Sequence, residues 1–335
     1  MSGSKETKPR RVTAQEVAQA AGVSRAAVSR AFTPGAYLSE EKKSRILEAA
    51  QKLGYRPNAL AAGLQRKGRS NLVAVVTGDI ANQFDSEIRA KLNRGLNRIG
   101  KWSIVLEGPE DMSEEKILEV LAYPLDALIL RGGSVSESVA FHCSQLNIPL
   151  IVSGRLMPGV DSVCCDNRQG ARIAVDQLVA SGRRNLAYVG GLNRLYSARE
   201  RRQGFEAALA AHGLAAVAFA KSDYSYAQGY EATTKLLSEN PHVDGLFCSN
   251  DVVAMGALAA AQQEHSRQVP EDLSIVGFDD ISMASWPDFQ LSTIKNDMDA
   301  TVEHILRLLV ERLNDEEKVG ETVVIKPEFV PRQTH

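Results

Sequence analysis

Residues 24–30 carry side chains of the types that contact base edges in a DNA groove. Arg25 and Ala26 fall on the outward face of a predicted helix. An arginine can donate two hydrogen bonds to O6 and N7 of guanine, and an alanine methyl can pack against the thymine methyl group. We therefore predict that these two residues read bases. The polar residues that we expect to contact phosphates or to orient the helix are Thr13, Ser24, Ser29 and Arg30.

A helix-turn-helix motif would turn those side chains outward. Thr13 and Glu16 have the spacing of a capping box, which begins a first helix. Ala18 permits two helices to cross closely, Gly22 can adopt the positive φ of the turn, and Val28 packs beneath them. The spacing of these residues predicts the motif.

Two further helices complete a small head over residues 1–56. Ser24 would cap a helix over 25–32. Ser39 would cap another over 40–52. Three short helices bury little apolar area, so we expect this head to be marginally stable alone.

The segment after the head, residues 57–70, is expected to become helical only on DNA. Asn58 can cap a helix of about two turns, which is too short to be stable in water. Gly63 weakens such a helix by about 1 kcal/mol more. Leu64 at its end could insert between base steps in the minor groove. The alternative is that Leu64 is a linker residue without a partner.

The charge distribution agrees with a DNA-binding head. Residues 1–70 contain fourteen Lys and Arg against five Asp and Glu, whereas the whole chain has a net charge of −2. A basic head on an acidic body is expected where only the head meets a polyanion, because phosphate contacts release condensed counterions. The alternatives are a solvated basic tail and, for any single polar residue of the head, a solvated face.

From residue 72 onward, short apolar runs alternate with amphipathic helical stretches. One helical stretch has an apolar stripe with a spacing of four, formed by Phe84, Ile88, Leu92 and Leu96. Such alternation predicts parallel sheets, and so many strands favour two doubly wound lobes with a ligand-binding cleft between them. A closed eight-fold barrel is the rival fold. The predicted strands are Leu72–Val76, Ile104–Leu106, Ala127–Leu130, Leu150–Val152, Leu186–Val189, Leu246–Cys248 and Leu273–Val276.

Several other classes of segment are missing from the sequence. No stretch resembles a signal peptide or offers about twenty uninterrupted apolar residues, so we expect a cytoplasmic protein without a membrane partner. No glycine-rich nucleotide motif follows a strand, and the histidines lack metal-site or triad spacing, which predicts no cofactor, no metal and no catalysis. The cysteines lack zinc-site spacing and are expected to be buried apolar residues: Cys143, Cys164, Cys165 and Cys248.

Five segments together resemble the LacI/GalR family of bacterial repressors over essentially the whole chain. They are VTAQEVAQAAGVSRAAVSR at 12–30, LGYRPNALAAGL at 53–64, Ser197–Phe205, Cys248–Leu258 and Val269–Asp280. The resemblance implies a helix-turn-helix head, a hinge helix whose Leu64 kinks the central step of the operator, and a body similar to periplasmic sugar-binding proteins. It also implies a homodimer that binds a palindromic operator.

The expected fold is therefore an all-α helix-turn-helix head followed by an α/β two-lobed periplasmic-binding-protein-like body, with two doubly wound parallel sheets joined by three crossing strands. The expected domains are the DNA-binding head over 1–56, the hinge helix and linker over 57–70, and the effector-binding and dimerisation domain over 71–335. Within the body, the N-terminal lobe is expected at about 71–168 and 296–322, and the C-terminal lobe at about 169–293 and 323–333.

The resemblance also implies ligand-binding residues in the body. The family positions fall on Arg199, Asn250 and Asp279, whose guanidinium, amide and carboxylate groups suit a hydroxyl-rich ligand. An aromatic side chain, Phe84 or Tyr224, would cover the apolar face of a sugar ring.

Additional arginines bear on the charge of the ligand. Arg155 resembles a family position that lines the cleft, and Arg131 ends a strand at the same sheet edge. Several arginines would suit a sugar acid, but arginine also serves neutral sugars in this family, so both remain open. Asp251 is expected to cap the following helix rather than to bind the ligand.

These features predict a sequence-specific transcriptional regulator, a repressor whose operator affinity is controlled by a small sugar or sugar acid. Its partners would be palindromic duplex DNA, this effector and a second copy of the chain. The rival functions are a solute-binding, receptor-like protein and a sugar-modifying enzyme, neither with a role on DNA. The sequence leaves open whether the effector acts as inducer or corepressor.

Overall fold

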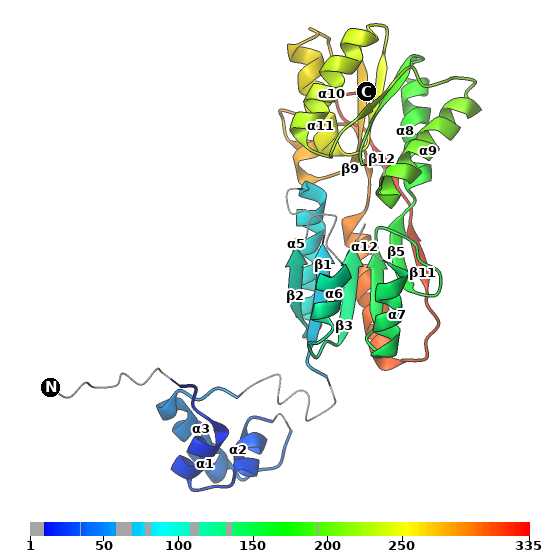
Figure 1. The fold of residues 1–335 in the computed structure, drawn as a ribbon. Coiled ribbons are helices and arrows are strands. Elements are labelled where there is room, and N and C mark those ends of the chain that lie inside the picture. Colours follow the sequence, from blue (N-terminus) through cyan, green and yellow to red (C-terminus); the bar gives the residue numbers. More distant parts are fainter. Residues whose placement is uncertain are drawn as a thin grey trace, which may run out of the picture. The chain divides into compact units, whose positions relative to one another are not determined.

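The chain divides into two compact units, residues 1–71 and 72–335, which are called the head and the body below. The head is a small group of helices, and the body consists of two α/β lobes (Figure 1). The computed structural model describes residues 10–33, 35–57, 69–77, 82–107, 114–131, 136–192 and 194–335.

The described part of the head contains three helices, α1 (Ala14–Ala21), α2 (Arg25–Ala31) and α3 (Glu40–Leu53). The predicted capping box is present, because Thr13 N donates to Glu16 Oε2 at 2.8 Å and Glu16 N donates to Thr13 Oγ1 at 3.4 Å. Gly22 ends α1 with a φ of 62°, as the turn requires. The helix-turn-helix prediction is confirmed. The innermost core residues are Val17, Val28 and Ile46.

The described residues of the body form two six-stranded sheets. The N-terminal sheet has the order β11-β5-β4-β3-β1-β2, and the C-terminal sheet has the order β12-β10-β9-β8-β6-β7. Among these strands, β10 and β12 pair antiparallel and the other pairs are parallel. The two open sheets confirm the doubly wound lobes and rule out the barrel.

The strands of the N-terminal sheet are β1 (Leu72–Thr77), β2 (Trp102–Glu107), β3 (Ala127–Arg131), β4 (Leu150–Ser153), β5 (Asp161–Cys165) and β11 (Thr322–Ile325). Those of the C-terminal sheet are β6 (Leu186–Gly190), β7 (Phe219–Lys221), β8 (Gly245–Cys248), β9 (Ser274–Asp279), β10 (Thr293–Lys295) and β12 (Glu328–Val330). Strands such as β6 and β9 are buried along their whole length, which explains why they read as continuous apolar runs.

Helices cover both faces of each sheet. The helices of the N-terminal lobe are α5 (Gln83–Arg98), α6 (Glu114–Val120), α7 (Glu137–Gln145) and α12 (Met298–Asn314). Those of the C-terminal lobe are α8 (Asn167–Ala180), α9 (Tyr196–Ala211), α10 (Tyr226–Glu239) and α11 (Asp251–Gln263), with α8 and α9 on one side of the sheet and α10 and α11 on the other (Figure 1). In the described ranges, no helix is long and apolar enough to span a bilayer. All four cysteines are free and buried, as expected.

The chain crosses between the lobes where strands of one sheet lead into elements of the other. Within the described residues these crossings follow β5, β10 and β11. The third crossing differs from the expected boundary at 322/323, because residues 322–325 pair with β5 and so belong to the N-terminal sheet. Five strands are not among those predicted: β5, β7, β10, β11 and β12. β7, β10 and β12 have only three residues each, and β7, β11 and β12 lie partly exposed. β5 is five residues long and buried, but it begins with the polar residues Asp161 and Ser162.

Close contact between α10 and α11 depends on glycine. A Cβ added to Gly229 would lie 2.6 Å from the carbonyl oxygen of Val253, and one added to Gly256 would lie 2.7 Å from the backbone nitrogen of Tyr230. The backbones of the two helices are therefore in contact at these glycines.

We predict that Gly256→Ala destabilises the body by about 1 to 3 kcal/mol, because the methyl group overpacks the α10–α11 contact. Helix propensity alone would make the alanine variant more stable by about 1 kcal/mol. The sign of the change in the free energy of unfolding therefore shows whether overpacking or helix propensity dominates. Urea unfolding followed by tryptophan fluorescence measures it. Gln262→Ala, on the exposed face of the same helix, is the control and should change stability little. A Gly256→Ala protein that is more stable than the parent would contradict the close packing.

Candidate functional site

The outward face of α2 carries the residues predicted to contact DNA. Arg25, Ala26, Ser29 and Arg30 are exposed there. Ser24 Oγ accepts from Ala27 N at 3.2 Å, so Ser24 caps α2 as Thr13 caps α1. These six residues therefore lie at the starts of α1 and α2 and on the exposed face of α2. Asn58 and Leu64, the residues of the expected hinge helix, lie outside the described residues.

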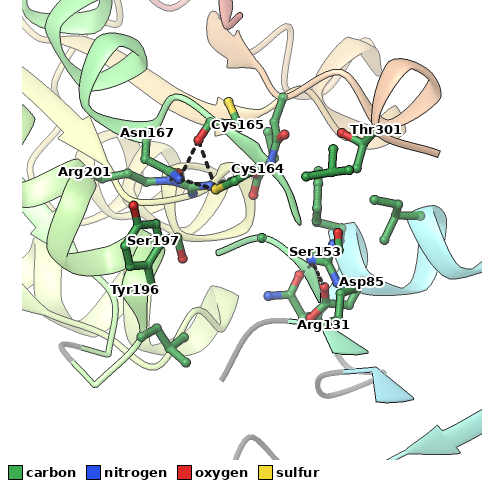
Figure 2. A pocket seen from close by; sticks show the side chains of 18 of the residues that line it. Asp85, Arg131, Ser153, Cys164, Cys165, Asn167, Tyr196, Ser197, Arg201 and Thr301 are labelled. Carbon is green, nitrogen blue, oxygen red and sulfur yellow. Dashed lines mark hydrogen bonds and ion pairs between the residues drawn. The ribbon is translucent and has the colours of Figure 1, made fainter. Parts of the chain in front are cut away.

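A second candidate site is a cavity between the two sheets of the body. Its volume is about 920 Å³, including the part that opens to solvent. The lining comes from the ends of strands in both sheets and from the first turns of α5, α8 and α9. Figure 2 shows Arg201, Asn167 and Tyr196 on one side of the cavity, and Asp85, Arg131 and Ser153 on the other. This is the position at which doubly wound folds bind ligands.

Arg201 on α9 forms the C-terminal side of the cavity. Its Nε donates to Asn167 Oδ1 at 2.8 Å, its Nη2 donates to Asp279 Oδ1 at 3.0 Å, and its Nη1 donates to the carbonyl oxygen of Ser249. The guanidinium also lies 3.6 Å from the centre of the Phe278 ring. Only 5% of the residue is exposed, so these contacts replace its hydration.

Asp279, at the end of β9, is the carboxylate partner of Arg201. It has a φ of 116°, in the region that disfavours residues other than glycine. Asn296 Nδ2 donates to the same oxygen at 3.2 Å. Burial raises the pKa of Asp279, and the neighbouring Arg201 opposes that rise.

The N-terminal side of the cavity repeats the arginine–carboxylate pairing. Arg131, at the end of β3, forms an ion pair with Asp85 in the first turn of α5. Its guanidinium also lies 4.9 Å from the centre of the Phe84 ring. Ser153, at the end of β4, is 1% exposed, and its hydroxyl has no hydrogen-bond partner among the described residues.

Tyr224 contributes an aromatic ring from the C-terminal lobe. Its φ of 71° is left-handed, and a Cβ added to Gly191 would lie 2.5 Å from Tyr224 Cε2. The ring therefore lies against a glycine that leaves room for it. Of the residues predicted to bind a ligand, the structure brings four to the cavity lining, namely Phe84, Arg131, Tyr224 and Asp279.

Three predicted ligand residues, Arg155, Arg199 and Asn250, are not in the described lining. Arg199 is exposed on α9, and its Nη1 donates to the carbonyl oxygen of Arg194 at 2.8 Å. Arg201, two positions further along the helix, faces the cavity instead. The buried face of α9 carries Ala198, Arg201 and Phe205, so the helical spacing of apolar residues could have pointed to Arg201.

Asn250 and Asp251 both differ from their expected roles. Asn250 caps α11, because its Oδ1 accepts from Val253 N at 2.9 Å. The expectation that Asp251 would be this cap is wrong. Asp251 Oδ2 instead accepts from Ile281 N at 2.9 Å, and its Oδ1 accepts from Thr293 Oγ1. Burial raises the pKa of Asp251 well above its ordinary value, with Asp279 adding to the rise.

Asp251 thereby holds the turn that follows β9. Asp279 and Asp280 both have positive φ in this turn. Ser282, two residues beyond them, donates from Oγ to Glu87 Oε1 of α5 at 2.6 Å. One short turn therefore connects a cavity carboxylate to a contact between the lobes.

Asn167, Asn296, Asp85 and Ser153 are cavity residues that sequence reasoning missed. Asn167 lies two residues after the end of β5 and Asn296 directly follows β10, at the first two crossings. A polar residue after a parallel strand is a usable signal, but these two strands were not predicted. Asp85 and Ser153 likewise stand beside strand ends or helix starts.

The described residues were searched for a metal site and for a reactive cysteine near the cavity. Among them, no three His, Cys, Asp or Glu side chains are grouped to hold a metal ion. Cys164 and Cys165 line the cavity, but burial raises the pKa of Cys164 to about 12, which disfavours the nucleophilic thiolate.

Comparisons with known proteins match both units. Residues 13–58 match the model of bacterial regulatory proteins, lacI family, and residues 175–335 match that of a periplasmic binding protein-like domain. Catabolite control protein A of Priestia megaterium is 32% identical over 328 residues, which cover 94% of this chain and 96% of that protein.

Two solved structures have the same architecture over nearly the whole chain. The lac repressor dimer bound to operator and the anti-inducer ONPF is 25% identical, with a TM-score of 0.85, and the match covers 97% of this chain and 99% of that one. The complex of the transcriptional regulator CelR with cellobiose is 26% identical, with a TM-score of 0.72, and the match covers 97% and 100%. The expected two-lobed body is confirmed.

We predict that Asp251→Asn changes the pH dependence of stability. A carboxyl group whose pKa is higher in the folded than in the unfolded state stabilises the fold at low pH, and this stabilisation is lost as pH rises. From about pH 4 upward, the parent should lose stability relative to the variant by up to about 1.4 kcal/mol per pH unit until the raised pKa is passed. Urea unfolding at several pH values measures this. Parallel profiles for parent and variant would contradict a raised pKa.

Proposed function

The chain belongs to the LacI family of bacterial regulatory proteins, and we propose that it is a sequence-specific transcriptional regulator whose operator affinity is set by a small sugar or sugar acid bound in the cavity. The observation that carries this proposal is the presence, in one chain, of the helix-turn-helix head and the cavity with its Arg201–Asp279 pair. The head would bind the DNA, and the cavity would bind the effector.

The solved relatives support each partner of this scheme. The lac repressor structure contains a dimer, an operator and an anti-inducer, and the CelR structure contains cellobiose. For this chain we accordingly propose a cytoplasmic homodimer on a palindromic operator, without enzymatic activity. A solute-binding receptor would make no use of the exposed face of α2, which favours the regulator over that alternative.

The effector would act by shifting an equilibrium between two arrangements of the lobes. A ligand that touches both Arg131 and Arg201 binds better where the lobes are close, and so favours that arrangement. The Ser282–Glu87 hydrogen bond would be made or broken with the same movement. Measurement of operator affinity with and without effector gives the sign of the coupling.

Arg25→Ala should weaken operator binding by about 1 to 3 kcal/mol, because one base contact is lost. Fluorescence anisotropy with DNA from upstream of the chain's own coding sequence measures the affinity. Arg45→Ala, which removes the same charge from the exposed surface of α3, is the matched control. It should weaken operator and random DNA equally. If Arg25→Ala also weakened both equally, Arg25 would be a phosphate contact only.

Arg201→Lys should lower effector affinity by at least about tenfold, since an ammonium group cannot reproduce the three-way donation of the guanidinium. Calorimetry with the effector and anisotropy with the operator measure the two affinities separately. Arg199→Lys makes the same chemical change outside the cavity and should leave both affinities unchanged. Operator affinity without effector should also survive Arg201→Lys. A loss of effector response in Arg199→Lys alone would restore Arg199 as the ligand residue.

A further inference from the structure

We propose that the effector is an uncharged polyhydroxy compound, a neutral sugar, and that the cavity discriminates against the corresponding sugar acid. This inference rests on the proposed function and narrows its effector class. It starts from the charges that line the cavity. In the part of the lining that the structure describes, the charged residues are Arg131, Arg201, Asp85 and Asp279. Two cations and two carboxylates leave no net charge for an anionic ligand to neutralise.

The pairing of these charges strengthens the argument. Arg131 contacts Asp85, and Arg201 contacts Asp279, with all four side chains exposed by 15% or less. A ligand carboxylate that approached either arginine would also approach its aspartate. At such distances in a partly desolvated site, repulsion between like charges offsets the attraction to the arginine.

Arg201 also has few donors left for a carboxylate. Each of its three nitrogens already donates to an acceptor of the protein, and its face is against Phe278. A guanidinium has five N–H groups, so two remain, one on each Nη. Because Nε already donates to Asn167, the side-on pair of parallel hydrogen bonds from Nε and an Nη to one carboxylate is blocked. A hydroxyl oxygen needs only one of the two remaining N–H groups.

The N-terminal end of α9 is the one feature described here that favours an anionic ligand. Helix α9 begins at the lining, and its N-cap residue Leu195 provides no side-chain cap. The positive end of a helix corresponds to about half an elementary charge. The ends of α5 and α8 are capped by Asn82 and Asp166. The partial charge of α9 adds to a set of side chains with no net charge, but backbone N–H groups also donate to hydroxyl oxygens. An acid would gain from this helix end and would still meet an aspartate beside each arginine, so Asp85 and Asp279 oppose it.

The remaining polar groups are suited to hydroxyls. The Ser153 hydroxyl is buried without a partner among the described residues, and Figure 2 shows it beside the Arg131–Asp85 pair. A hydroxyl group both donates and accepts, so it can satisfy a carboxylate oxygen, a guanidinium proton and a serine in turn. Phe84 and Tyr224 supply apolar surface for the C–H groups of a ring.

The test compares sugars in matched pairs that differ only by a carboxylate. D-glucose is paired with D-glucuronate, D-galactose with D-galacturonate, D-xylose with D-xylonate, D-ribose with D-ribonate, and cellobiose with cellobionate. Thermal unfolding and calorimetry on the full-length protein measure binding at constant pH and ionic strength. We expect the neutral member of at least one pair to bind, and its acid to bind at least tenfold more weakly.

A charge variant gives a second, independent readout. Asp85→Asn removes the carboxylate beside Arg131 and gives the cavity a net positive charge, so the affinity ratio of acid to neutral sugar should rise at least tenfold. Glu206→Gln makes the same change on the exposed surface of α9, where Glu206 pairs with Arg202, and should leave the ratio unchanged. The unliganded thermal midpoint of each variant serves as the folding control.

The outcomes separate this inference from the proposed function. An acid that binds the parent as tightly as its neutral partner and alters operator affinity overturns the inference and leaves the regulator intact. An unchanged ratio in Asp85→Asn also overturns the charge argument. If no member of any pair binds or alters operator affinity, both the neutral effector and the sugar-responsive function are overturned.

Discussion

Burial of the Arg201 guanidinium is the constraint from which the geometry of the cavity follows. A charged group removed from water costs several kcal/mol unless its donors are satisfied and its charge is balanced. Here the balance comes from Asp279 and the remaining acceptors from Asn167 and Ser249. These partners stand on three different elements of the C-terminal lobe, so a single side chain holds together the lobe's side of the cavity.

The turn after β9 is the second consequence of that pairing. Asp279 contacts Arg201 from a backbone with a positive φ of 116°, and Asp280 also has a positive φ. Such strain persists where surrounding contacts over-determine it. Asp251 accepts from Ile281 N, and Arg332 Nη2 donates to Asp280 Oδ1 at 2.6 Å. The same turn ends at the Ser282–Glu87 hydrogen bond, so binding chemistry and contact between the lobes share one rigid segment.

Local rules in the sequence were sufficient for the head and for the class of the body. The capping box of Thr13 and Glu16 and the positive φ of Gly22 depend on residues a few positions apart, so their spacing predicts them. Strands that are buried on both faces, such as β6 and β9, can be recognised in the sequence as apolar runs. The sequence also predicts four residues of the cavity lining, Phe84, Arg131, Tyr224 and Asp279, and here the expectation of a sugar cavity comes from the family resemblance.

Only the tertiary structure decided which residues of a motif face the cavity. Arg199 and Arg201 belong to one motif, but the rotation of α9 against its sheet turns the second inward and the first to solvent. The sequence also could not tell which of Asn250 and Asp251 caps α11. Asn250 is the cap, and Asp251 accepts a hydrogen bond from Ile281, thirty residues away in the chain. The sequence by itself determined elements whose causes are local, such as caps, turns and apolar periodicity. Contacts between distant residues, including the seventy-eight-residue separation of Arg201 and Asp279, follow from how the elements pack, which no local pattern encodes.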